Sequence, residues 1–523
     1  MIRFQHKLVR LNRAERRALR HAYSIRPNKL LTRNIYLGLD GRLHLRNLHT
    51  IVVGGSGAGK SRCYAIPNLM QANTSFVTLD PKGELLRTTG NLLKEQGYVI
   101  KVINLIEMQK SDCYNPFVYL RNENDVQKLV TNLFNATTPK NSSTNDPFWD
   151  NQAKMLLSSY IFYLLSEAPP EEQNFEMVLE LLRAAVVDEE NDKYVSATDK
   201  LFMELEDKDP DNIAVKYYKD SKKGAGKTLK SIQATLGARL EKFNINQLAA
   251  MTSTDDLDLP SLGERKTALF AIIPDSDTSF NFIVSMLYTQ LFQQLFDLAD
   301  NKYHGHLPVP VHFLMDEFAN VALPDDFDKM LATMRSRDIF VSIILQNLSQ
   351  LKALFEKQWE SIIGNCDQFL YLGGNDQSTC EYISKQLGKQ TIDMNTYGRS
   401  KGRNGSYSTN YQITGRELMT PDEVRMLDNR YAILFIRGER PVIDLKIDPL
   451  KHPLAYKTPL VKKGGKPYNI DDLTEPSCML EMQLLDESDG FACTAIEDLP
   501  MQPAAEGYDF LSSTEINKMF GLD

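Results

Sequence analysis

The chain has 523 residues, of which 42% are hydrophobic and 24% charged, and its formal net charge is −8. This length supports two or three domains with hydrophobic cores, and the composition excludes a disordered or fibrous protein. Six cysteines occur without C-x-x-C or Cys/His spacing, which favours a reduced cytoplasmic protein without a zinc site. No stretch reaches the roughly 18 to 20 apolar residues of a spanning helix, so we expect a soluble chain.

Charge is segregated to the two ends of the chain. Residues 1–33 contain ten Lys/Arg and the single acid Glu15, a net charge of plus nine. Residues 468–523 contain thirteen Asp/Glu and only Lys518, a net charge of minus twelve. The basic end is either a solvated helix or a segment that approaches nucleic acid or an anionic membrane surface.

The run GGSGAGKS at positions 54–61 fits the phosphate loop G-x-x-x-x-G-K-[ST] at every fixed position. A β-branched run at 49–53 precedes it, and residues 61–67 are typical of a helix start. Backbone N–H groups of such a loop surround phosphates at the positive end of a helix. We therefore predict a nucleoside triphosphate site with Lys60 on the β- and γ-phosphates and Ser61 on Mg²⁺. The predicted binding residues are Gly54, Gly55, Ser56, Gly57, Ala58, Gly59, Lys60, Ser61 and Arg62.

The run GAGKT at 224–228 resembles this loop but has Ser221 where the first glycine should be. No hydrophobic strand precedes it, so the pattern favours a helix or a loop.

Short β-rich apolar runs recur along the chain, and helical patterns separate most of them. Strands that alternate with helices after a phosphate loop predict an α/β fold, with a mainly parallel sheet covered by helices on both faces. The predicted strands are 51–53, 75–79, 98–103, 267–273, 311–315, 339–345, 368–372 and 431–436.

The hydrophobic pattern changes between 125 and 265, where few strand signals occur. Stretches with helical periodicity at 152–165, 175–185 and 228–243 predict an inserted all-α domain. The expected layout has four parts. Residues 1–33 form a basic segment, 34–124 and 266–457 the nucleotide-binding domain, 125–265 the insertion, and 458–523 a linker at 462–467 with a partly ordered acidic tail.

The predicted strand 311–315 ends in Asp316 and Glu317, which places two carboxylates at the carboxyl edge of the sheet. An acid pair alone is more often a cap. Together with a phosphate loop, the pair predicts that Asp316 orders the Mg²⁺ shell and Glu317 polarises the attacking water.

Two further polar positions follow predicted strands. Asp80 opens a charged Pro-Gly turn that either braces the nucleotide or is a plain turn. Gln346 either hydrogen-bonds the γ-phosphate or its attacking water, and reports nucleotide state, or caps the strand end.

The predicted helix 327–337 ends with Arg335 and Arg337. One of them could act as an arginine finger on a neighbouring subunit, or both could complement the helix dipole.

The stretch 396–416 places Arg399, Lys401, Arg403 and Tyr407 among Gly, Ser and Asn. It is either a DNA-contacting loop or a mobile surface loop.

These segments together resemble the coupling ATPases of type IV secretion and conjugative DNA transfer, the TraG/TraD class, especially those of Gram-positive mobile elements. The resemblance runs from about 34 to 457. It rests on GGSGAGKSR, LDPKGEL at 79–85, YNPF at 114–117, DPFWDNQAK at 146–154, LMDEFAN at 314–320, MRSRDI at 334–339 and ILQNLSQL at 344–351.

The resemblance implies a RecA-like motor that hydrolyses ATP as a hexamer around a channel and drives DNA export. It also implies that Arg335 is the trans arginine finger and that the helical insertion selects relaxase-bound DNA. The acidic tail is similar to extensions that recruit substrate proteins, and Ser512 with Glu515 predicts a capped helix at 514–520.

Members of this class usually carry N-terminal membrane-spanning helices, which this sequence lacks. Either the protein docks through a membrane or channel partner at the inner face of the membrane, or the anchor has been removed. Without an anchor, the isolated chain could remain monomeric.

The leading hypothesis is therefore a coupling protein that uses ATP and Mg²⁺ to move single-stranded, relaxase-bound DNA to a secretion channel. Two alternatives stay open: a duplex DNA pump of the FtsK type, and a nucleotide-bound receptor without catalysis. The choice of ATP over GTP rests on the resemblance alone.

Overall fold

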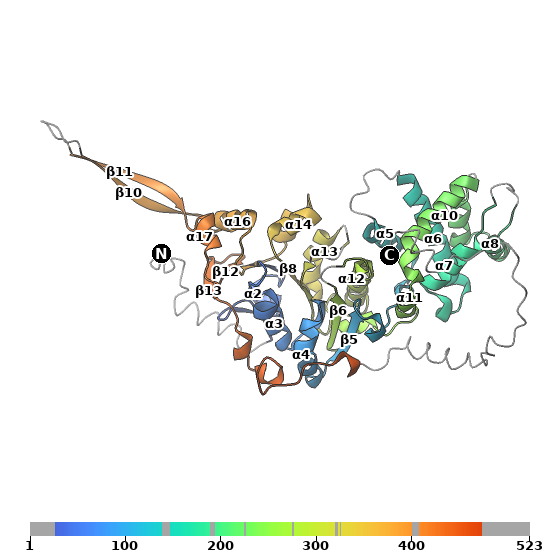
Figure 1. The fold of residues 1–523 in the computed structure, drawn as a ribbon, viewed down its shortest axis with the longest axis horizontal. Helices are drawn as coiled ribbons and strands as arrows, with labels where there is room; N and C mark the ends of the chain where they lie inside the picture. Colours follow the sequence, from blue (N-terminus) through green and yellow to red (C-terminus); the bar gives the residue numbers. More distant parts are fainter. Residues whose placement is uncertain are drawn as a thin grey trace, which may run out of the picture. The chain divides into compact units, whose positions relative to one another are not determined.

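The computed structural model describes residues 27–138, 147–188, 194–223, 226–274, 277–318, 323–324, 326–399 and 407–472 (Figure 1). All of them belong to one compact unit within Met1–Met479. Three predictions fall outside these ranges: most of the basic head, the contacts of Lys401 and Arg403, and the acidic tail with its helix at 514–520.

The centre of the fold is a nine-stranded sheet in the order β13-β12-β9-β3-β8-β7-β4-β6-β5. Neighbours from β9 to β5 run parallel, whereas β12 is antiparallel to β9 and β13 to β12. This confirms the predicted α/β fold with a mainly parallel sheet. The strands are β3 (Thr50–Val53), β4 (Ser75–Pro81), β5 (Val99–Asn104), β6 (Thr267–Ile273), β7 (Val311–Met315), β8 (Ile339–Leu345), β9 (Gln368–Tyr371), β12 (Tyr431–Ile436) and β13 (Val442–Leu445).

The central strands are apolar along their whole length because both faces of the sheet are covered. Every residue of β3, β6, β7 and β8 is buried. Ile51 and Val53 belong to one core, with α12 (Asn281–Asp297) and α13 (Phe327–Met334). Val52 belongs to the other core, with α3 (Ile66–Met70) and α4 (Glu84–Glu95).

Helices fill the chain between β5 and β6, and the described residues of this stretch contain no strand. Residues 226–228, the described part of the run GAGKT, begin helix α10 (Gly226–Leu240), which is one of the two outcomes that the sequence favoured. The exact limits of the predicted insertion stay a prediction. The helices are α5 (Glu123–Thr137), α6 (Pro147–Glu167), α7 (Phe175–Ala184), α8 (Ala197–Lys208), α9 (Ile213–Ser221), α10 (Gly226–Leu240) and α11 (Asn246–Met251).

Helix α12 contacts both the sheet and the segment that leads into the helical stretch. The Gln290 side chain accepts a 2.6 Å hydrogen bond from Tyr114 and donates a 2.8 Å bond to the carbonyl of Pro116. On the sheet side, the ring of Phe292 lies 4.6 Å from that of Phe313 in β7. Helix α12 therefore joins the two regions through polar contacts on one side and aromatic packing on the other.

The predicted linker at 462–467 contains a close turn against the segment that precedes it. Gly465 donates to the carbonyl of Tyr456, and a Cβ on this glycine would lie 2.0 Å from the carbonyl of Lys457. The chain then returns to α4, where Tyr468 is buried and donates its N–H to the carbonyl of Arg87. The glycines allow this close turn, and the buried Tyr468 anchors the segment that follows it.

The prediction of a loop at 396–416 is wrong for the described residues 396–399 and 407–416, which lie in strands. Strands β10 (Lys389–Arg399) and β11 (Tyr407–Glu417) pair as an antiparallel hairpin, drawn in orange in Figure 1. Gly, Ser and Asn have low strand propensity, so composition concealed strands that backbone pairing determines.

The basic head does not remain solvated throughout. Strands β1 (Asn28–Leu30) and β2 (Tyr36–Gly38) pair with each other. Lys29 is buried and donates to the carbonyl of Leu48 and to the hydroxyl of Thr50. Within the described residues, no helix combines the length and apolar character needed to cross a bilayer.

Candidate nucleotide site

The predicted site residues follow the carboxyl ends of four adjacent strands, in the order β3, β8, β7, β4. The phosphate loop follows β3, and Gln346 follows β8. Asp316 and Glu317 follow β7, and Asp80 lies near the end of β4. Parallel strands place their carboxyl ends at one edge, which is where open α/β sheets bind ligands.

The phosphate loop has the backbone its glycines were expected to permit. Gly57 and Gly59 have φ of +75° and +90°, a region that favours glycine. The N–H of Gly54 donates to Leu345 of β8 at 3.0 Å, and that of Gly55 donates to Gly373 at 2.9 Å. The loop is therefore held between the ends of β8 and β9.

The lysine of the loop lies over it. Lys60 Nζ donates to the carbonyls of Gly54 at 3.0 Å and Gly55 at 3.4 Å. Of the other predicted loop residues, Ala58 is buried in the core, whereas Ser56 and Arg62 are exposed. The helix after the loop begins as a π-helical turn, Ser61–Ala65, before α3.

Ser61 and Asp316 are brought together from positions 255 residues apart. The Ser61 hydroxyl donates to the carboxylate of Asp316, which is buried. Burial raises the pKa of Asp316, while the Ser61 hydrogen bond and the charge of Lys60 oppose that rise. The next residue, Glu317, has a left-handed backbone with φ of +55°, which is uncommon for a residue with a side chain.

A cavity of about 150 Å³ lies at this edge of the sheet. It contains the predicted lysine, serine and acids together with the turn after β4. Its lining residues are Lys60, Ser61, Asp80, Pro81, Lys82, Glu84, Leu85, Asp316 and Glu317.

Asp80 is engaged with the protein itself. Its two carboxylate oxygens accept from the backbone N–H groups of Leu85 at 3.0 Å and Leu86 at 2.8 Å, at the start of α4. Burial raises the pKa of Asp80 to about 7, with those two hydrogen bonds opposing the rise. Asp80 thus fixes the turn that lines the cavity.

Gln346 lies between the phosphate loop and the acid pair because β8 separates β3 from β7. Its side chain is exposed and is not among the cavity-lining residues, and its backbone N–H donates to Gln350 Oε1 at 2.9 Å.

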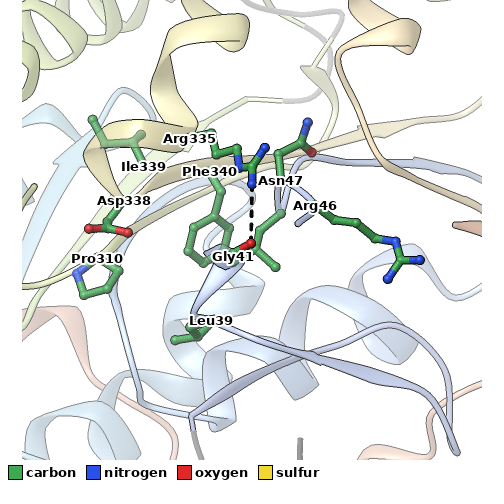
Figure 2. Close-up of a pocket in the computed structure, with 10 residues that line it drawn as sticks. Leu39, Gly41, Arg46, Asn47, Pro310, Arg335, Asp338, Ile339 and Phe340 are labelled. Carbon is green, nitrogen blue, oxygen red and sulfur yellow. Dashed lines mark hydrogen bonds between the residues drawn. The ribbon is translucent and has the colours of Figure 1, made fainter. Parts of the chain in front are cut away.

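Arg335 lies at the opposite edge of the sheet. It lies four residues before the start of β8, which is parallel to β3, so the length of β8 separates it from the phosphate loop. Seven strand residues span about 23 Å. Figure 2 shows Arg335 in a pocket beside Leu39 and Phe340, where it donates a 3.4 Å hydrogen bond to the carbonyl of Gly41 in α2 (Gly41–His44).

The two arginines of this turn differ in their partners. Arg337 forms a two-point pair with Asp300, at 2.9 and 2.7 Å, and stacks 4.7 Å from the ring centre of Phe296. Arg335 is exposed and has the one long bond described above. Of the pair, Arg335 is the more available for another molecule.

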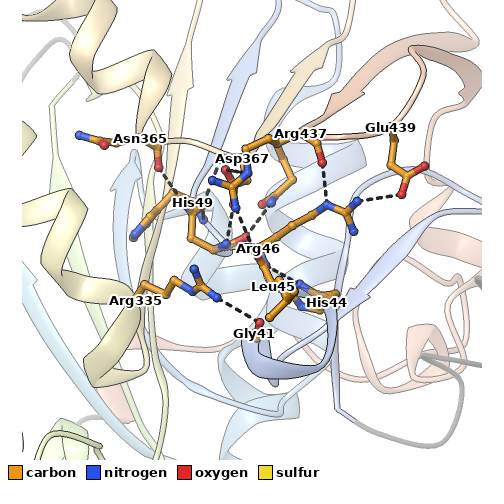
Figure 3. Close-up of polar contacts among 12 residues, drawn as sticks. Gly41, His44, Leu45, Arg46, His49, Arg335, Asn365, Asp367, Arg437 and Glu439 are labelled. Atoms are coloured by element: carbon orange, nitrogen blue, oxygen red, sulfur yellow. Dashed lines mark hydrogen bonds and ion pairs between the residues drawn. The ribbon is translucent and has the colours of Figure 1, made fainter.

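The segment under Arg335 is tied to the sheet by an ionic network (Figure 3). Arg46 pairs with Glu439 at 2.8 Å and donates to the carbonyl of Arg437 at 2.7 Å. Asp367 accepts from the backbone of Asn47 at 2.6 Å and pairs with Arg437 at 3.0 Å. These contacts fix the segment between α2 and β3 against β9 and β12.

Sequence reasoning missed three residues that shape the phosphate loop. Gly373 and Gly374 follow β9, and a Cβ on Gly374 would lie 3.3 Å from the backbone nitrogen of Gly55. Lys446 is buried and donates from Nζ to the carbonyl of Ala58 at 2.8 Å. The Gly-Gly pair directly after a predicted strand could have indicated a contact with the phosphate loop. Lys446 lies almost 400 residues after Ala58 in the sequence, and no sequence pattern indicated their contact.

The residues present fit a nucleoside phosphate with Mg²⁺. Lys60 supplies a cation beside the glycine loop, and the bonded pair of Ser61 and Asp316 supplies two oxygen ligands of the kind that Mg²⁺ prefers. Ser61 and Asp316 would hold the metal, and the loop N–H groups and Lys60 would hold the phosphates.

Known proteins match over most of the chain. Protein VirD4 of Rhizobium rhizogenes is 23% identical over 404 residues, covering 75% of this chain and 57% of the relative. Conjugal transfer protein TraG of Rhizobium radiobacter is 23% identical over 409 residues, covering 75% of this chain and 61% of the relative. The chain thus spans less than two thirds of the length of these relatives.

Solved structures show the same fold. The unbound bacterial conjugative coupling protein TrwBdeltaN70 aligns with a TM-score of 0.60 at 16% identity, covering 82% of this chain and 90% of that one. Plasmid coupling protein TrwB in complex with ADP and Mg²⁺ aligns with a TM-score of 0.58 at 16% identity, covering 82% and 92%.

The family described as "Type IV secretory system Conjugative DNA transfer" matches residues 8–459, which is most of the sequence. The chain therefore belongs to the type IV secretory system conjugative DNA transfer family.

Proposed function

We propose that this protein is a coupling ATPase of conjugative DNA transfer, a motor that hydrolyses ATP and moves DNA toward a type IV secretion channel. The observation that carries the proposal is the contact of Ser61 with Asp316, beside Lys60 and Glu317 in one cavity. Hydrolysis needs a phosphate cradle, metal ligands and a residue that activates water. This edge of the sheet holds a candidate for each.

Each residue has a proposed role that follows from its position. Lys60 and the loop N–H groups bind the β- and γ-phosphates, and Ser61 with Asp316 holds Mg²⁺. When bound, Mg²⁺ neutralises charge on the phosphate oxygens. Glu317 takes the proton of the attacking water, and Asp80 keeps the 80–84 turn against the site through its two bonds to α4.

Gln346 contacts the γ-phosphate or the attacking water from its place between the loop and the acid pair. Its exposure at the strand end leaves it accessible to nucleotide. Arg335 serves a neighbouring copy, because its own phosphate loop lies at the other edge of the sheet. A head-to-tail ring, such as a hexamer, would bring the two edges together.

The proposed cargo is single-stranded DNA carried with a relaxase, and the proposed working place is the cytoplasmic face of the membrane, beside a channel or anchor partner. Support comes from the family description and from the conjugal names of the relatives. ATP with Mg²⁺ as the cofactor is supported by the similarity to TrwB in complex with ADP and Mg²⁺.

The test is steady-state ATP hydrolysis by the full chain, alone and with single-stranded or duplex DNA, while light scattering measures its mass. Glu317→Gln is expected to lower turnover by about 10²- to 10⁴-fold while retaining nucleotide binding, because it removes a proton acceptor. Glu84→Gln is the matched control, since it removes a carboxylate from the same cavity and is expected to stay within a few-fold of wild type.

Stimulation by single strands that rises with oligomer mass supports the coupling motor. Stimulation by duplex alone would favour an FtsK-type pump. Nucleotide binding without turnover in any assembly would overturn the motor and leave a receptor.

A further inference from the structure

The turn after β4 brings a second lysine to the nucleotide cavity. Lys82 lines this cavity together with Lys60, Asp316 and Glu317. Lys82 is exposed, whereas Gly83 after it is buried. Among the described residues that line the cavity, Lys60 and Lys82 are the only cations. The cavity therefore has one cation from the loop after β3 and another from the turn after β4.

The acid pair lies between these two lysines. Strand β7 is next to β4, and Leu79 of β4 is directly paired with Met315 of β7. Glu317 is two residues beyond Met315, and Lys82 is three residues beyond Leu79, so both leave the sheet at neighbouring positions. Lys60 belongs to the loop after β3, and β8 separates β3 from β7. A phosphate held by that loop beside Glu317 would thus have Lys82 on the side opposite Lys60.

The backbone of Lys82 has a conformation that lysine rarely adopts. Its φ is +66°, and that of Gly83 is +69°. Seven non-glycine residues in the described part of the chain have a positive φ, and two of them, Lys82 and Glu317, line this cavity. A left-handed backbone is costly for a residue with a Cβ, and such residues concentrate at functional sites. Glycine would fit position 82 without this cost, so the lysine side chain is what the position retains.

Contacts from three directions hold the backbone of this turn. The N–H of Lys82 donates to the carbonyl of Ile273, at the end of β6, at 3.3 Å. The carbonyl of Lys82 accepts from Arg87 of α4 at 3.2 Å, and the N–H of Gly83 donates to the carbonyl of Asp80 at 3.3 Å. A group that is held in place before binding loses less conformational freedom when the ligand arrives. Lys82 is therefore attached to a backbone that is already fixed beside the cavity.

The charges in the cavity favour a further cation when a triphosphate binds. Four carboxyl groups line it, those of Asp80, Glu84, Asp316 and Glu317. Mg²⁺ would offset the charge of Asp316, but a γ-phosphate beside Glu317 would meet a like charge, and like charges at close range repel. Lysine ammonium groups bind phosphate oxygens through charge-assisted hydrogen bonds. Lys82 supplies such a group on the Glu317 side of the cavity.

We propose that Lys82 binds the γ-phosphate of the nucleotide in its own subunit, from the side opposite Lys60, and thereby favours the triphosphate over the diphosphate. This inference rests on the proposed function and adds a second cation to the same site. Within the turn, Asp80 fixes the backbone and Lys82 contacts the ligand.

The test is calorimetric titration of the full chain with ADP and with adenylyl imidodiphosphate, a non-hydrolysable ATP analogue, at constant Mg²⁺. The two ligands differ at the γ-phosphate. Lys82→Gly is expected to weaken binding of the analogue by at least about tenfold, because a hydrogen bond from a charged group is lost, and to change binding of ADP by less than about twofold. Lys82→Arg retains the cation and is expected to keep the preference for the analogue.

His304→Gly is the matched control. His304 is exposed, has a φ of +55° and precedes Gly305, whose φ is also positive, but it does not line the cavity. Both glycine substitutions relieve the same backbone conformation, so each is expected to keep the melting temperature at or above that of wild type. Only Lys82→Gly is expected to lose affinity for the analogue. Weaker binding by a protein of undiminished stability would separate a contact with the ligand from a defect of the turn.

Equal losses of affinity for ADP and for the analogue in Lys82→Gly would overturn the inference, because the turn would then shape the whole site. Unchanged affinity for both ligands would also overturn it, as would the same loss in His304→Gly. Hydrolysis of ATP by the wild-type chain tests the proposed function separately. A wild-type chain that binds both ligands without turnover would remove the motor and leave the assignment of Lys82 intact, so the two failures remain distinguishable.

Discussion

Lys446 donates from Nζ to the carbonyl of Ala58 at 2.8 Å and to Asn429 Oδ1 at 2.6 Å, which ties the residue after β13 to the phosphate loop. Burial lowers the pKa of this lysine, and the nearby Cys63 and Asp428 oppose that effect. The antiparallel edge of the sheet thus takes part in shaping the nucleotide site.

Lys446→Met is expected to weaken binding of a non-hydrolysable ATP analogue with Mg²⁺ by about tenfold, since a hydrogen bond from a charged group contributes about 1.5 to 3 kcal/mol. Calorimetric titration measures the affinity. Lys451→Met, at an exposed lysine on the same stretch, is the control and is expected to change little. Unchanged affinity in Lys446→Met would mean that the loop keeps its shape without this contact.

Lys60→Ala and Arg335→Ala are each expected to abolish ATP hydrolysis, but mixing the two proteins is expected to restore part of it. Their defects lie at opposite edges of the sheet, so a ring interface can combine one intact edge from each copy. Random mixing at equal amounts restores about a quarter of the interfaces. Absence of recovery in mixed oligomers of confirmed mass would contradict a role in trans.

Arg337→Ala is expected to act differently from Arg335→Ala because its guanidinium is paired with Asp300 and stacked on Phe296. We expect Arg337→Ala to lower the melting temperature about as much as Asp300→Ala does. We expect no recovery of ATP hydrolysis when Arg337→Ala is mixed with Lys60→Ala. Thermal unfolding of the two single variants and the double variant measures their coupling. Additive effects would show that the pair contributes little to stability.

The effect of Gly90→Ala on the free energy of unfolding is expected to have opposite signs in the presence and in the absence of the Tyr468 side chain. A Cβ at Gly90 would lie 2.7 Å from the ring of Tyr468, so the substitution displaces the C-terminal segment from α4. In a Tyr468→Gly chain the ring and the Cβ that would lie within 3.0 Å are both absent, and the same substitution is expected to stabilise α4 by about 1 kcal/mol through helix propensity. Melting temperatures of the four proteins decide this; the same sign in both backgrounds would show that Tyr468 does not occupy the space beside Gly90.

The raised pKa of Asp80 predicts how the free energy of unfolding changes with pH. Its pKa is raised by burial from 3.8 to about 7, with Asp316 and Glu84 adding to the rise. The folded state therefore binds more protons than the unfolded state between about pH 4 and pH 7, and stability contributed by protonated Asp80 is lost as pH rises through that window. Asp80→Asn cannot titrate, so its free energy of unfolding should fall less over this range. Urea unfolding at a series of pH values compares the two slopes, and identical slopes would contradict the raised pKa.

The sequence predicted what depends on local pattern. The strands at 267–273, 311–315, 339–345 and 431–436 have the predicted limits, because continuous apolar runs mark strands that are covered on both faces. The phosphate loop and the acid pair were recognisable in the sequence because each consists of particular residue types directly after a predicted strand.

The sequence could not predict what depends on pairing and packing between distant residues. The sequence analysis placed Tyr468 in the acidic tail after the linker, because its contact with Gly90 comes from far along the chain. The strand pairing of β10 with β11 was hidden by the glycine, serine and asparagine residues of this stretch. Lys446 has no motif, and only the return of β13 brings it to the loop.

Helix α12 sets a limit on how this protein can be recombined with its relatives. Gln290 forms hydrogen bonds with Tyr114 and with the carbonyl of Pro116, which both lie between β5 and β6. Gln290 itself lies in α12, which follows β6. A chimera that exchanges the whole stretch between β5 and β6, which contains Tyr114 and Pro116, would leave this buried amide facing foreign partners. A segment that is exchanged between relatives must therefore include α12. A substitution at Gln290 is tolerated only together with a compensating change at Tyr114 or beside Pro116.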